Sequence, residues 1–261
     1  MKGTFASSPI LTIALALSIA LAVGGSAAMA QNTNQVQAEV QKVLSNSKYE
    51  GVHASVQNNG LVVLTGSVEV FDLKEKIDHK VHRIKGVKAV ENDIQVAGTP
   101  ISDQELSAKL VKAIEYDRVG YGTTPFNAIS VNVRDGVVTL GGHAYGPVDA
   151  DSAAAVAANT KGVKDVINDI QVDPPSPMDD SIRIRTFRAI YSYPSLNKYA
   201  MDPGKTIRIS VQNGRVTLIG VVDNQADKYA AGIRANTVPG VFHVDNQLQV
   251  VNDQDEKRAS R

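Results

Sequence analysis

The residues best suited to chemistry are two histidines with acidic neighbours. His79 and His82 stand three positions apart, and Glu75 and Asp78 lie beside them in the sequence. Imidazole and carboxylate groups on one helix are possible ligands for a divalent metal ion. The apolar positions of that helix mark another face as the buried one, and they are Leu73, Ile77 and Val81. We therefore predict a solvated, charged helix face with no metal bound.

Other catalytic arrangements find no support in the sequence. The chain has no cysteine, so a thiol nucleophile is excluded. No Gly-x-Ser-x-Gly turn positions a serine, and the recurring glycines lack the lysine and Ser/Thr of a phosphate-binding loop. The carboxylates are scattered over predicted helix faces and turns, where solvation is the usual state. We predict a protein that is not an enzyme, with no catalytic residue and no cofactor.

A basic region with tyrosines is the remaining candidate site. Residues 99–173 carry 6 basic and 10 acidic groups, whereas residues 174–261 carry 12 and 9. Positive charge beside tyrosine suits an anionic lipid surface, at about 1 kcal/mol per well-placed Lys or Arg. The predicted lipid-binding residues are Arg183, Arg185, Arg188, Tyr193, Lys198, Tyr199, Lys205 and Arg208. Two alternatives stay open: the charges form a solvated face, and the tyrosine-rich loops pack over the core.

The elements that would position these residues repeat three times. The repeat is marked by three glycines per copy, spaced 6 and 20 residues apart and recurring after 76 and then 78 residues. Each set precedes a similar segment, at 92–96, 168–172 and 246–250. This regularity predicts one small domain in triplicate. We interpret the glycines as structural, serving turns and helix ends; they are Gly60, Gly66, Gly86, Gly136, Gly142, Gly162, Gly214, Gly220 and Gly240.

Each copy shows the pattern helix, hairpin, helix, strand. Ser102 and Glu105 have capping-box spacing before a helical apolar period. The pairs Asn59-Gly60, Asp135-Gly136 and Asn213-Gly214 join alternating strands and predict type I′ turns. The apolar positions assigned to the last helix are Tyr229, Ala230 and Ile233. With a right-handed parallel crossover, the prediction is an α+β fold: three tandem αββαβ modules, each a three-stranded mixed sheet with two helices on one face.

The N-terminus is typical of an export signal. Lys2 precedes an uncharged apolar run from Ile10 to Val23, and Ala28-Met29-Ala30 offers a cleavage site. We predict removal of residues 1–30 after Ala30 and a periplasmic mature protein. The predicted modules are residues 31–98, 99–173 and 174–251, followed by a disordered, charged tail at 252–261. The linker at 173–177 is rich in proline and should hold the last two modules apart as stiffly joined, separate domains.

These features resemble the BON (bacterial OsmY and nodulation) domain. The similarity rests on the αββαβ order, the Asx-Gly hairpins, the Lys-Gly-Val steps at 85–87 and 161–163, and the Asn-Asp-Ile-Gln-Val strand. It covers residues 34–97, 102–173 and 180–251, although Pro239 and Gln247 depart from the pattern in the third copy. The resemblance implies an OsmY-like exported protein of three tandem BON domains, without catalysis, that associates with phospholipid membranes or envelope partners.

Two classes of function follow. The first is peripheral association with anionic phospholipid, in envelope maintenance or stress tolerance. The second is a protein-interaction or chaperone-like stress protein that binds envelope proteins and no lipid. Nucleic acid is excluded as a partner by the predicted export and by a formal net charge of +0. No hydrophobic run after residue 30 is long enough for a transmembrane segment.

Overall fold

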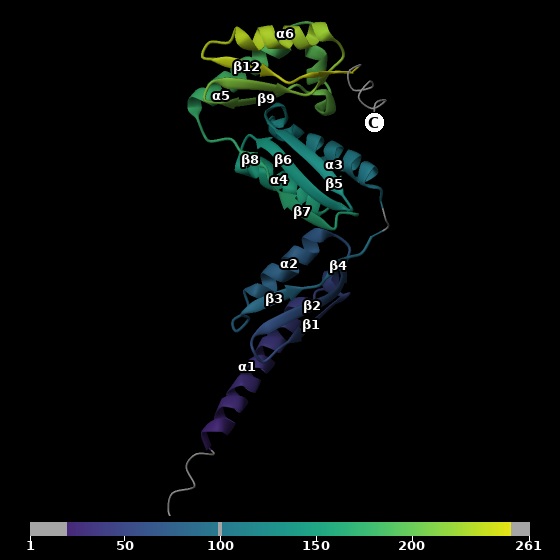
Figure 1. Ribbon diagram of the computed structural model, residues 1–261, viewed down its shortest axis with the longest axis vertical. Coiled ribbons are helices and arrows are strands. Elements are labelled where there is room, and N and C mark those ends of the chain that lie inside the picture. The colour runs from purple at the N-terminus through teal and green to yellow at the C-terminus, as the bar shows by residue number, and fades with distance from the viewer. Residues whose placement is uncertain (1–19, 99–100, 252–261) are drawn as a thin grey trace, which may run out of the picture. The chain divides into compact units, whose positions relative to one another are not determined.

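The computed structural model describes residues 20–98 and 101–251, and the chain folds there into three αββαβ modules (Figure 1). It divides into two compact units, of which one holds most of the first module and the other holds the second and third. Lys2, most of the predicted apolar run and the predicted tail at 252–261 lie outside the described residues. The predicted cleavage point after Ala30 falls within the first helix.

The first module begins with a long helix, and the elements of its repeat follow in the predicted order. They are α1 (Ala20–Leu44), β1 (Val52–Val56), β2 (Leu61–Val68), α2 (Phe71–His82), β3 (Ala89–Asn92) and β4 (Gln95–Val96). Val36, Val40 and Leu44 of α1 are buried, together with Ile77 and Val81 of α2. The helical period of Ile77 and Val81 therefore identified the buried face of α2, and Val36, Val40 and Leu44 follow the same period on α1.

The second and third modules repeat this order. The second consists of α3 (Asp103–Asp117), β5 (Ala128–Arg134), β6 (Val137–Ala144), α4 (Pro147–Ala158), β7 (Asp165–Asn168) and β8 (Gln171–Val172). The third consists of α5 (Pro177–Tyr191), β9 (Arg208–Gln212), β10 (Arg215–Ile219), β11 (Val221–Val222), α6 (Gln225–Asn236), β12 (His243–Asn246) and β13 (Gln249–Val250). Within each of these modules the two helices contact one another over the sheet.

Each sheet is mixed, and the second strand of the hairpin is its centre. β2 pairs antiparallel with β1 and parallel with β3, and β6 and β10 occupy the same position in their modules. The pairs β3/β4, β7/β8 and β12/β13 are each one last strand interrupted after its fourth residue. The parallel crossover and the predicted α+β fold are therefore confirmed.

Two of the three hairpins have the predicted turn. Asp135 and Gly136 take φ of 54° and 80°, and Asn213 and Gly214 take 51° and 72°, as a type I′ turn requires. The first hairpin differs, because Asn59 does not take positive φ and only Gly60 does, at 85°. Gly60 N donates to Gln57 O at 3.0 Å, which makes a three-residue loop ending in a glycine. The type I′ prediction for Asn59-Gly60 is therefore wrong.

All nine repeat glycines take positive φ. At the middle position of each set a second reason applies in the first two modules. A Cβ on Gly66 would lie 2.0 Å from Gly51 O, and one on Gly142 would lie 2.1 Å from Ala128 O. The backbones of the two hairpin strands approach too closely there for any side chain.

A carboxylate at the start of the first helix ties that helix to the hairpin in modules two and three. Asp103 accepts hydrogen bonds from the N–H groups of Asp135 and Gly136, at 2.7 and 3.0 Å. Asp179 binds Asn213 N and Gly214 N in the same way, at 2.9 Å each. Each turn thus has its two exposed donors satisfied, and the helix is fixed over its own sheet.

The second and third modules pack against one another within one compact unit. Phe126 of the second packs against the core of the third, with its ring centroid 6.0 Å from that of Phe187. Tyr116 of α3 donates to Asp202 Oδ1 at 2.9 Å, from one module to the other. The linker is short because Pro177 already begins α5. The expectation of stiffly joined but independent modules is therefore wrong for this pair, since long loops of both fill the space between them.

Candidate functional site

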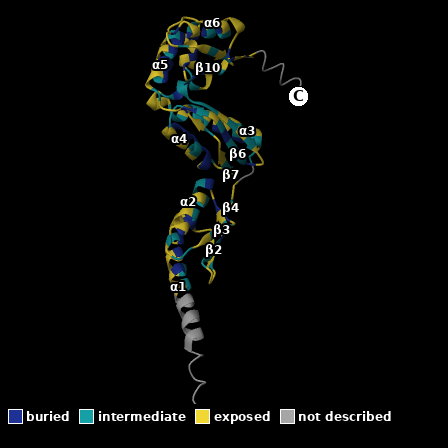
Figure 2. Ribbon diagram, turned by 60° about the vertical axis from the view of Figure 1, so that its left-hand side comes forward, coloured by how far each residue is buried: buried dark blue, intermediate teal, exposed yellow. Residues whose placement is uncertain are grey.

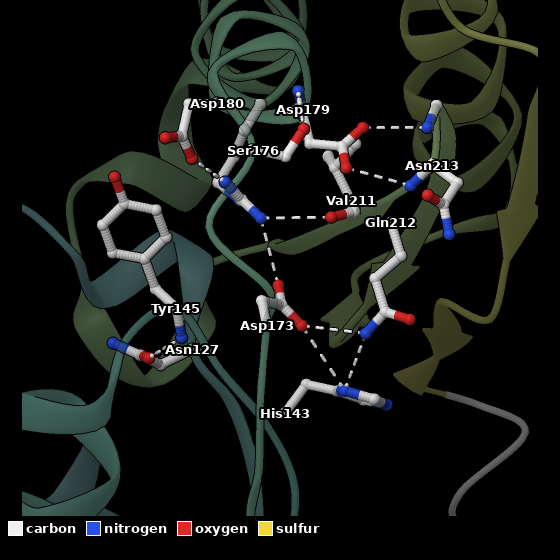
Figure 3. Close-up of polar contacts among 12 residues, drawn as sticks. Asn127, His143, Tyr145, Asp173, Ser176, Asp179, Asp180, Val211, Gln212 and Asn213 are labelled. Atoms are coloured by element: carbon white, nitrogen blue, oxygen red, sulfur yellow. Dashed lines mark hydrogen bonds and ion pairs between the residues drawn. The ribbon is translucent and has the colours of Figure 1, made fainter.

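Arg183 is the first predicted lipid-binding residue to be corrected. It is only 2% exposed. Its Nη2 donates to Asp173 Oδ2 at 3.0 Å and to Val211 O at 3.1 Å, and its Nη1 contacts Asp180 (Figure 3). The guanidinium also lies 4.9 Å from the ring centroid of Tyr145. Arg183 therefore faces the second module, and it is a structural ion-pair residue that a membrane surface cannot reach in this fold.

Asp173 is the centre of this polar joint between the two modules. Besides Arg183, its carboxylate accepts from Gln212 Nε2 at 2.9 Å and lies 3.5 Å from His143 Nδ1 (Figure 3). Gln212 Nε2 also lies 3.1 Å from the same histidine nitrogen. Asp173 is the last residue before the proline-rich linker, so these contacts hold the start of that linker against both modules.

Tyr199 and Lys198 also make structural contacts, within the third module. Tyr199 is 1% exposed, and its hydroxyl donates to Asp227 at 2.8 Å while accepting from Asp223 N at 2.7 Å. Lys198 Nζ lies 2.7 Å from Asp223 and 2.8 Å from Asp227, and hydrogen bonds to these two carboxylates raise the pKa of Lys198 above its usual value. The loop that holds Lys198 and Tyr199 therefore packs on the third module, in agreement with the alternative interpretation of the tyrosine-rich loops.

Arg208, another residue of the predicted set, is half-buried. It donates to the carbonyls of Thr124 and Pro203, the second at 2.8 Å, and lies 3.6 Å from Glu115 Oε1. Burial lowers the pKa of its guanidinium, and Glu115 partly opposes that effect. Thr124 and Glu115 belong to the second module, so Arg208 serves the joint as Arg183 does.

Lys198 is exposed although it is paired, and the other exposed residues of the predicted set are Arg185, Arg188, Tyr193 and Lys205. Arg185, Arg188 and Tyr193 lie on or directly after α5, while Lys205 lies on a short 3₁₀ turn, Pro203–Lys205, beside α3. Arg185 makes local contacts, since it donates to Ser181 O at 3.1 Å and to Ser181 Oγ at 3.0 Å. Helix α5, with Arg185 and Arg188, is therefore the element that could present positive charge to a partner.

Helix α6 supplies exposed apolar residues beside α5. Part of the α6 ribbon is coloured as exposed (Figure 2). Tyr229 and Ile233, one helical turn apart on this helix, are 63% and 64% exposed. The predicted burial is therefore wrong for Tyr229 and Ile233, because Asp227, Ala231 and Ala235 face the core instead, whereas Ala230 is half-buried and packs against the core as predicted. Arg234 joins the helices, since its Nε donates to Ala189 O at 3.0 Å and its guanidinium lies 5.7 Å from the Tyr193 ring.

We name these residues the α5–α6 surface: Arg185, Arg188, Tyr193, Tyr229, Ile233 and Arg234. The acidic residues of α5 and α6 bind groups outside this surface, so the charge of the surface is positive. Asp179 binds the hairpin turn, Asp180 contacts Arg183, and Asp227 accepts from Tyr199 and Lys198. Exposed apolar side chains of α6 and exposed arginines of α5 thus lie on two helices in contact, and the carboxylates of both helices bind other groups.

A comparison between the repeats could have revealed this surface. By the glycine frame, Tyr229 corresponds to Asp151 and Glu75, and Ile233 corresponds to Ala155 and His79. All four counterparts are exposed. Large apolar residues at positions that are polar or small in the other copies are therefore a signal for exposure rather than for burial, and the helical period within one copy cannot distinguish the two.

The described residues hold no arrangement for a metal ion. His82 Nδ1 lies 3.7 Å from Asp78 Oδ2, one turn away on α2. Throughout residues 20–98 and 101–251, no group of three or more His, Asp or Glu is gathered as metal ligands. Within the same residues, no helix combines the length and the apolar character needed to cross a bilayer.

Comparison with known proteins identifies the repeated module. A family model described as "BON domain" matches residues 32–98, 102–174 and 195–252. The chain belongs to the BON domain family. The match to the third BON domain begins after α5, so the helix that carries Arg185 and Arg188 lies outside the matched segment.

One curated relative covers most of this BON protein. It is the osmotically-inducible protein Y of Escherichia coli K12, 26% identical over 191 residues, which are 72% of this chain and 92% of the relative. Among solved structures, CdsD, the structural protein of the type III secretion system of Chlamydia trachomatis, is 16% identical in its C-terminal domain. The alignment covers 82% of this chain and 96% of that chain, with a TM-score of 0.22, which is too low to support a conclusion.

Proposed function

We propose that this BON protein is an exported, non-catalytic envelope protein that associates peripherally with anionic phospholipid through the α5–α6 surface of its third module. The observation that carries the proposal is the pair Tyr229 and Ile233, well exposed on α6, which contacts the helix that carries the exposed Arg185 and Arg188. Arginine is attracted to the negative potential of such a membrane, and tyrosine suits the headgroup region.

The energies suit weak, reversible binding. Each arginine near an anionic surface contributes about 1 kcal/mol, and the exposed area of Tyr229 and Ile233 adds about 25 cal/mol per Å² that enters the lipid. Two arginines and two side chains therefore give a salt-sensitive association rather than permanent insertion. This is the behaviour expected of a peripheral protein.

Export and a role in stress rest on the sequence and on the relative. Lys2, the apolar run and Ala28-Met29-Ala30 support removal of a signal peptide and a periplasmic location. The relative is named for osmotic induction, which supports a role in envelope stress. The absence of catalysis is supported by the polar clusters described above, because the carboxylates of these clusters serve as caps and ion-pair partners of the fold. Mass analysis of the exported protein should find Gln31 at its N-terminus, and retention of Lys2 would contradict export by cleavage.

Sedimentation with vesicles tests lipid binding. The full chain should pellet with phosphatidylglycerol-containing vesicles, less so as salt rises and the charges are screened, and should stay in solution with pure phosphatidylcholine. Replacing Arg185 and Arg188 together by Gln should weaken binding about tenfold or more, from the loss of about 2 kcal/mol. Arg183 is left intact in this variant, because it is buried in the joint.

The second module supplies the matched control. Lys109 and Lys112 occupy the positions of Arg185 and Arg188 on α3, and both are exposed. Replacing them by Gln removes the same charge and should change vesicle binding little, because Asp151 and Ala155 stand where Tyr229 and Ile233 do. Indifference of the full chain to anionic vesicles, with specific capture of envelope proteins, would instead favour the protein-interaction function.

A further inference from the structure

A polar cleft of about 240 Å³ lies where the open sheet face of the third module meets the second module. One wall is His143 of β6, and the others come from β9, β10 and the interruption between β12 and β13. The lining residues are His143, Ser210, Gln212, Arg215, Thr217, Ile219 and Gln247, of which only Ile219 is apolar. A cavity of about 150 Å³ is enough to hold benzene, so this cleft has room for a small polar molecule.

The strand register explains why these side chains gather in one place. Thr217 stands opposite Ser210, and Arg215 stands opposite Gln212, in the antiparallel pair of β9 and β10. Alternate residues of a strand share a face, so all four side chains lie on the same face of the sheet. The residues between them are apolar and form the core under α5 and α6. Hydroxyl, amide and guanidinium groups are thus what this sheet presents on its open face.

Arg215 is the one permanently charged side chain that lines the cleft. It is exposed, and within the described part of the chain its guanidinium has no hydrogen bond, ion pair or ring contact. By the glycine frame its counterparts are Leu61 and Val137, so the third module alone carries a cation at this position. A guanidinium without a partner can bind a carboxylate through two parallel hydrogen bonds. This position therefore favours an anionic group of a ligand.

Two carboxylates adjoin residues of the cleft, and both have partners. Asp173 is bound by Arg183 and by Gln212 Nε2, as described above. Asp245 of β12 stands in register with Thr217, and its Oδ2 accepts from Gln247 Nε2 at 2.7 Å. Neither carboxylate lines the cleft, so the charge that the cleft itself presents is that of Arg215.

The neutral groups of the cleft offer both donors and acceptors. Gln212 Nε2 donates to Asp173 and lies 3.1 Å from His143 Nδ1, so that nitrogen accepts and the imidazole proton is on Nε2 (Figure 3). Among the described residues, His143 Nε2 and Gln212 Oε1 have no further partner. The hydroxyls of Ser210 and Thr217 also lack one there, and neither hydroxyl is fully enclosed by protein. Such groups suit a ligand that carries hydroxyls of its own.

We propose that this cleft binds a small hydroxylated carboxylate, such as a sugar acid, with its carboxylate on the Arg215 guanidinium. The ligand hydroxyls exchange hydrogen bonds with Ser210, Thr217 and the Gln212 amide. The site is built from both modules, since His143 belongs to the second and the other lining residues belong to the third. It lies on the face of the sheet opposite α5 and α6, and it is therefore separate from the α5–α6 surface.

Titration of the full chain with four matched compounds tests the proposal by NMR. Gluconate, sorbitol and glucamine share a six-carbon polyol chain and differ in the charge of one end, while hexanoate keeps the carboxylate and lacks the hydroxyls. We expect gluconate to bind about tenfold or more tightly than sorbitol, as a charged hydrogen bond implies, and more tightly than hexanoate, with glucamine weakest. Amide shifts should centre on β9, β10 and Gln247. Failure of gluconate to bind, or an affinity no higher than that of sorbitol or hexanoate, would overturn the proposal.

Two variants assign the binding to this cleft. Arg215→Gln should lower the affinity for gluconate about tenfold and leave that for sorbitol unchanged, because only the carboxylate loses its partner. Thr217→Val keeps the size of the side chain and should lower both affinities about threefold. The control is Arg83→Gln, which removes the same charge from an exposed position of the first module and should change neither affinity. An unchanged melting temperature shows that each variant is folded, and unchanged gluconate affinity in folded Arg215→Gln would refute the site.

Discussion

At the scale of single residues, Arg183 and Arg185 lie two positions apart on α5 and have opposite surroundings. Arg183 is bound by Asp173, Asp180 and Val211 O in the interior, whereas Arg185 is exposed and donates to Ser181 one turn away. In the sequence the two are equivalent members of a basic cluster, because nothing local distinguishes them. Asp173, which decides the difference, stands before the linker and meets Arg183 only in the folded joint.

This difference predicts unequal effects on stability. Arg183→Met leaves Asp173 and Asp180 without their cation and should lower the free energy of unfolding by about 3–5 kcal/mol, as for other broken buried pairs. Arg185→Gln should change it by less than about 0.5 kcal/mol, as is usual at exposed positions. Urea unfolding followed by circular dichroism measures both. Similar losses of unfolding free energy in the two variants would mean that the buried ion pair of Arg183 stabilises the fold no more than the exposed Arg185 does.

At the scale of elements, much of the fold follows from local rules in the sequence. The helices, two of the hairpins and the parallel crossover were predictable, because helical period and Asx-Gly chemistry act over a few residues. The Asn59-Gly60 turn was not, because the same dipeptide also ends a longer loop. The buried face of α6 was not predictable from its own period, since Ala231 and Ala235 are small and Tyr229 and Ile233 are large. The distance between α6 and its sheet decides whether the small pair or the large pair of side chains can face the core.

The packing of α6 predicts which of its positions are sensitive to the size of the side chain. Ala231 is fully buried, and a Cβ on the neighbouring Gly232 would lie 2.8 Å from Asn246 Nδ2, so the helix lies close to the sheet. Ala231→Leu should cost about 1–3 kcal/mol through overpacking. Ile233→Ala removes an exposed side chain and should cost less than about 0.5 kcal/mol. Thermal unfolding of both variants checks this, and a large loss for Ile233→Ala would show that Ile233 belongs to the core.

At the scale of the whole molecule, the joint couples the second and third modules. Asp173 belongs to the end of one module and is bound by Arg183 and Gln212 of the other, and Phe126 packs on Phe187. None of these contacts is visible in the sequence, because each pairs residues from different repeats whose spacing follows no local period.

The coupling predicts shared protection in hydrogen exchange. Asp173→Asn weakens the pair with Arg183, and we expect amides of β6 and of β9 to lose protection together, by a similar factor. A piece spanning residues 101–173 keeps its own helices and sheet and is still expected to fold, but with lower stability than in the chain. Loss of protection confined to the third module would show that the two modules unfold independently despite their contacts.

The central claim is that the α5–α6 surface enters an anionic membrane, and a single introduced tryptophan tests it most directly. The chain has no tryptophan, so Ile233→Trp places the sole indole on that surface, and Tyr121→Trp places it on an exposed position of the second module. With phosphatidylglycerol vesicles we predict a blue shift of the emission for Ile233→Trp, reversed by salt, and none for Tyr121→Trp. An unshifted Ile233→Trp spectrum under conditions where the protein sediments with the vesicles would contradict the account.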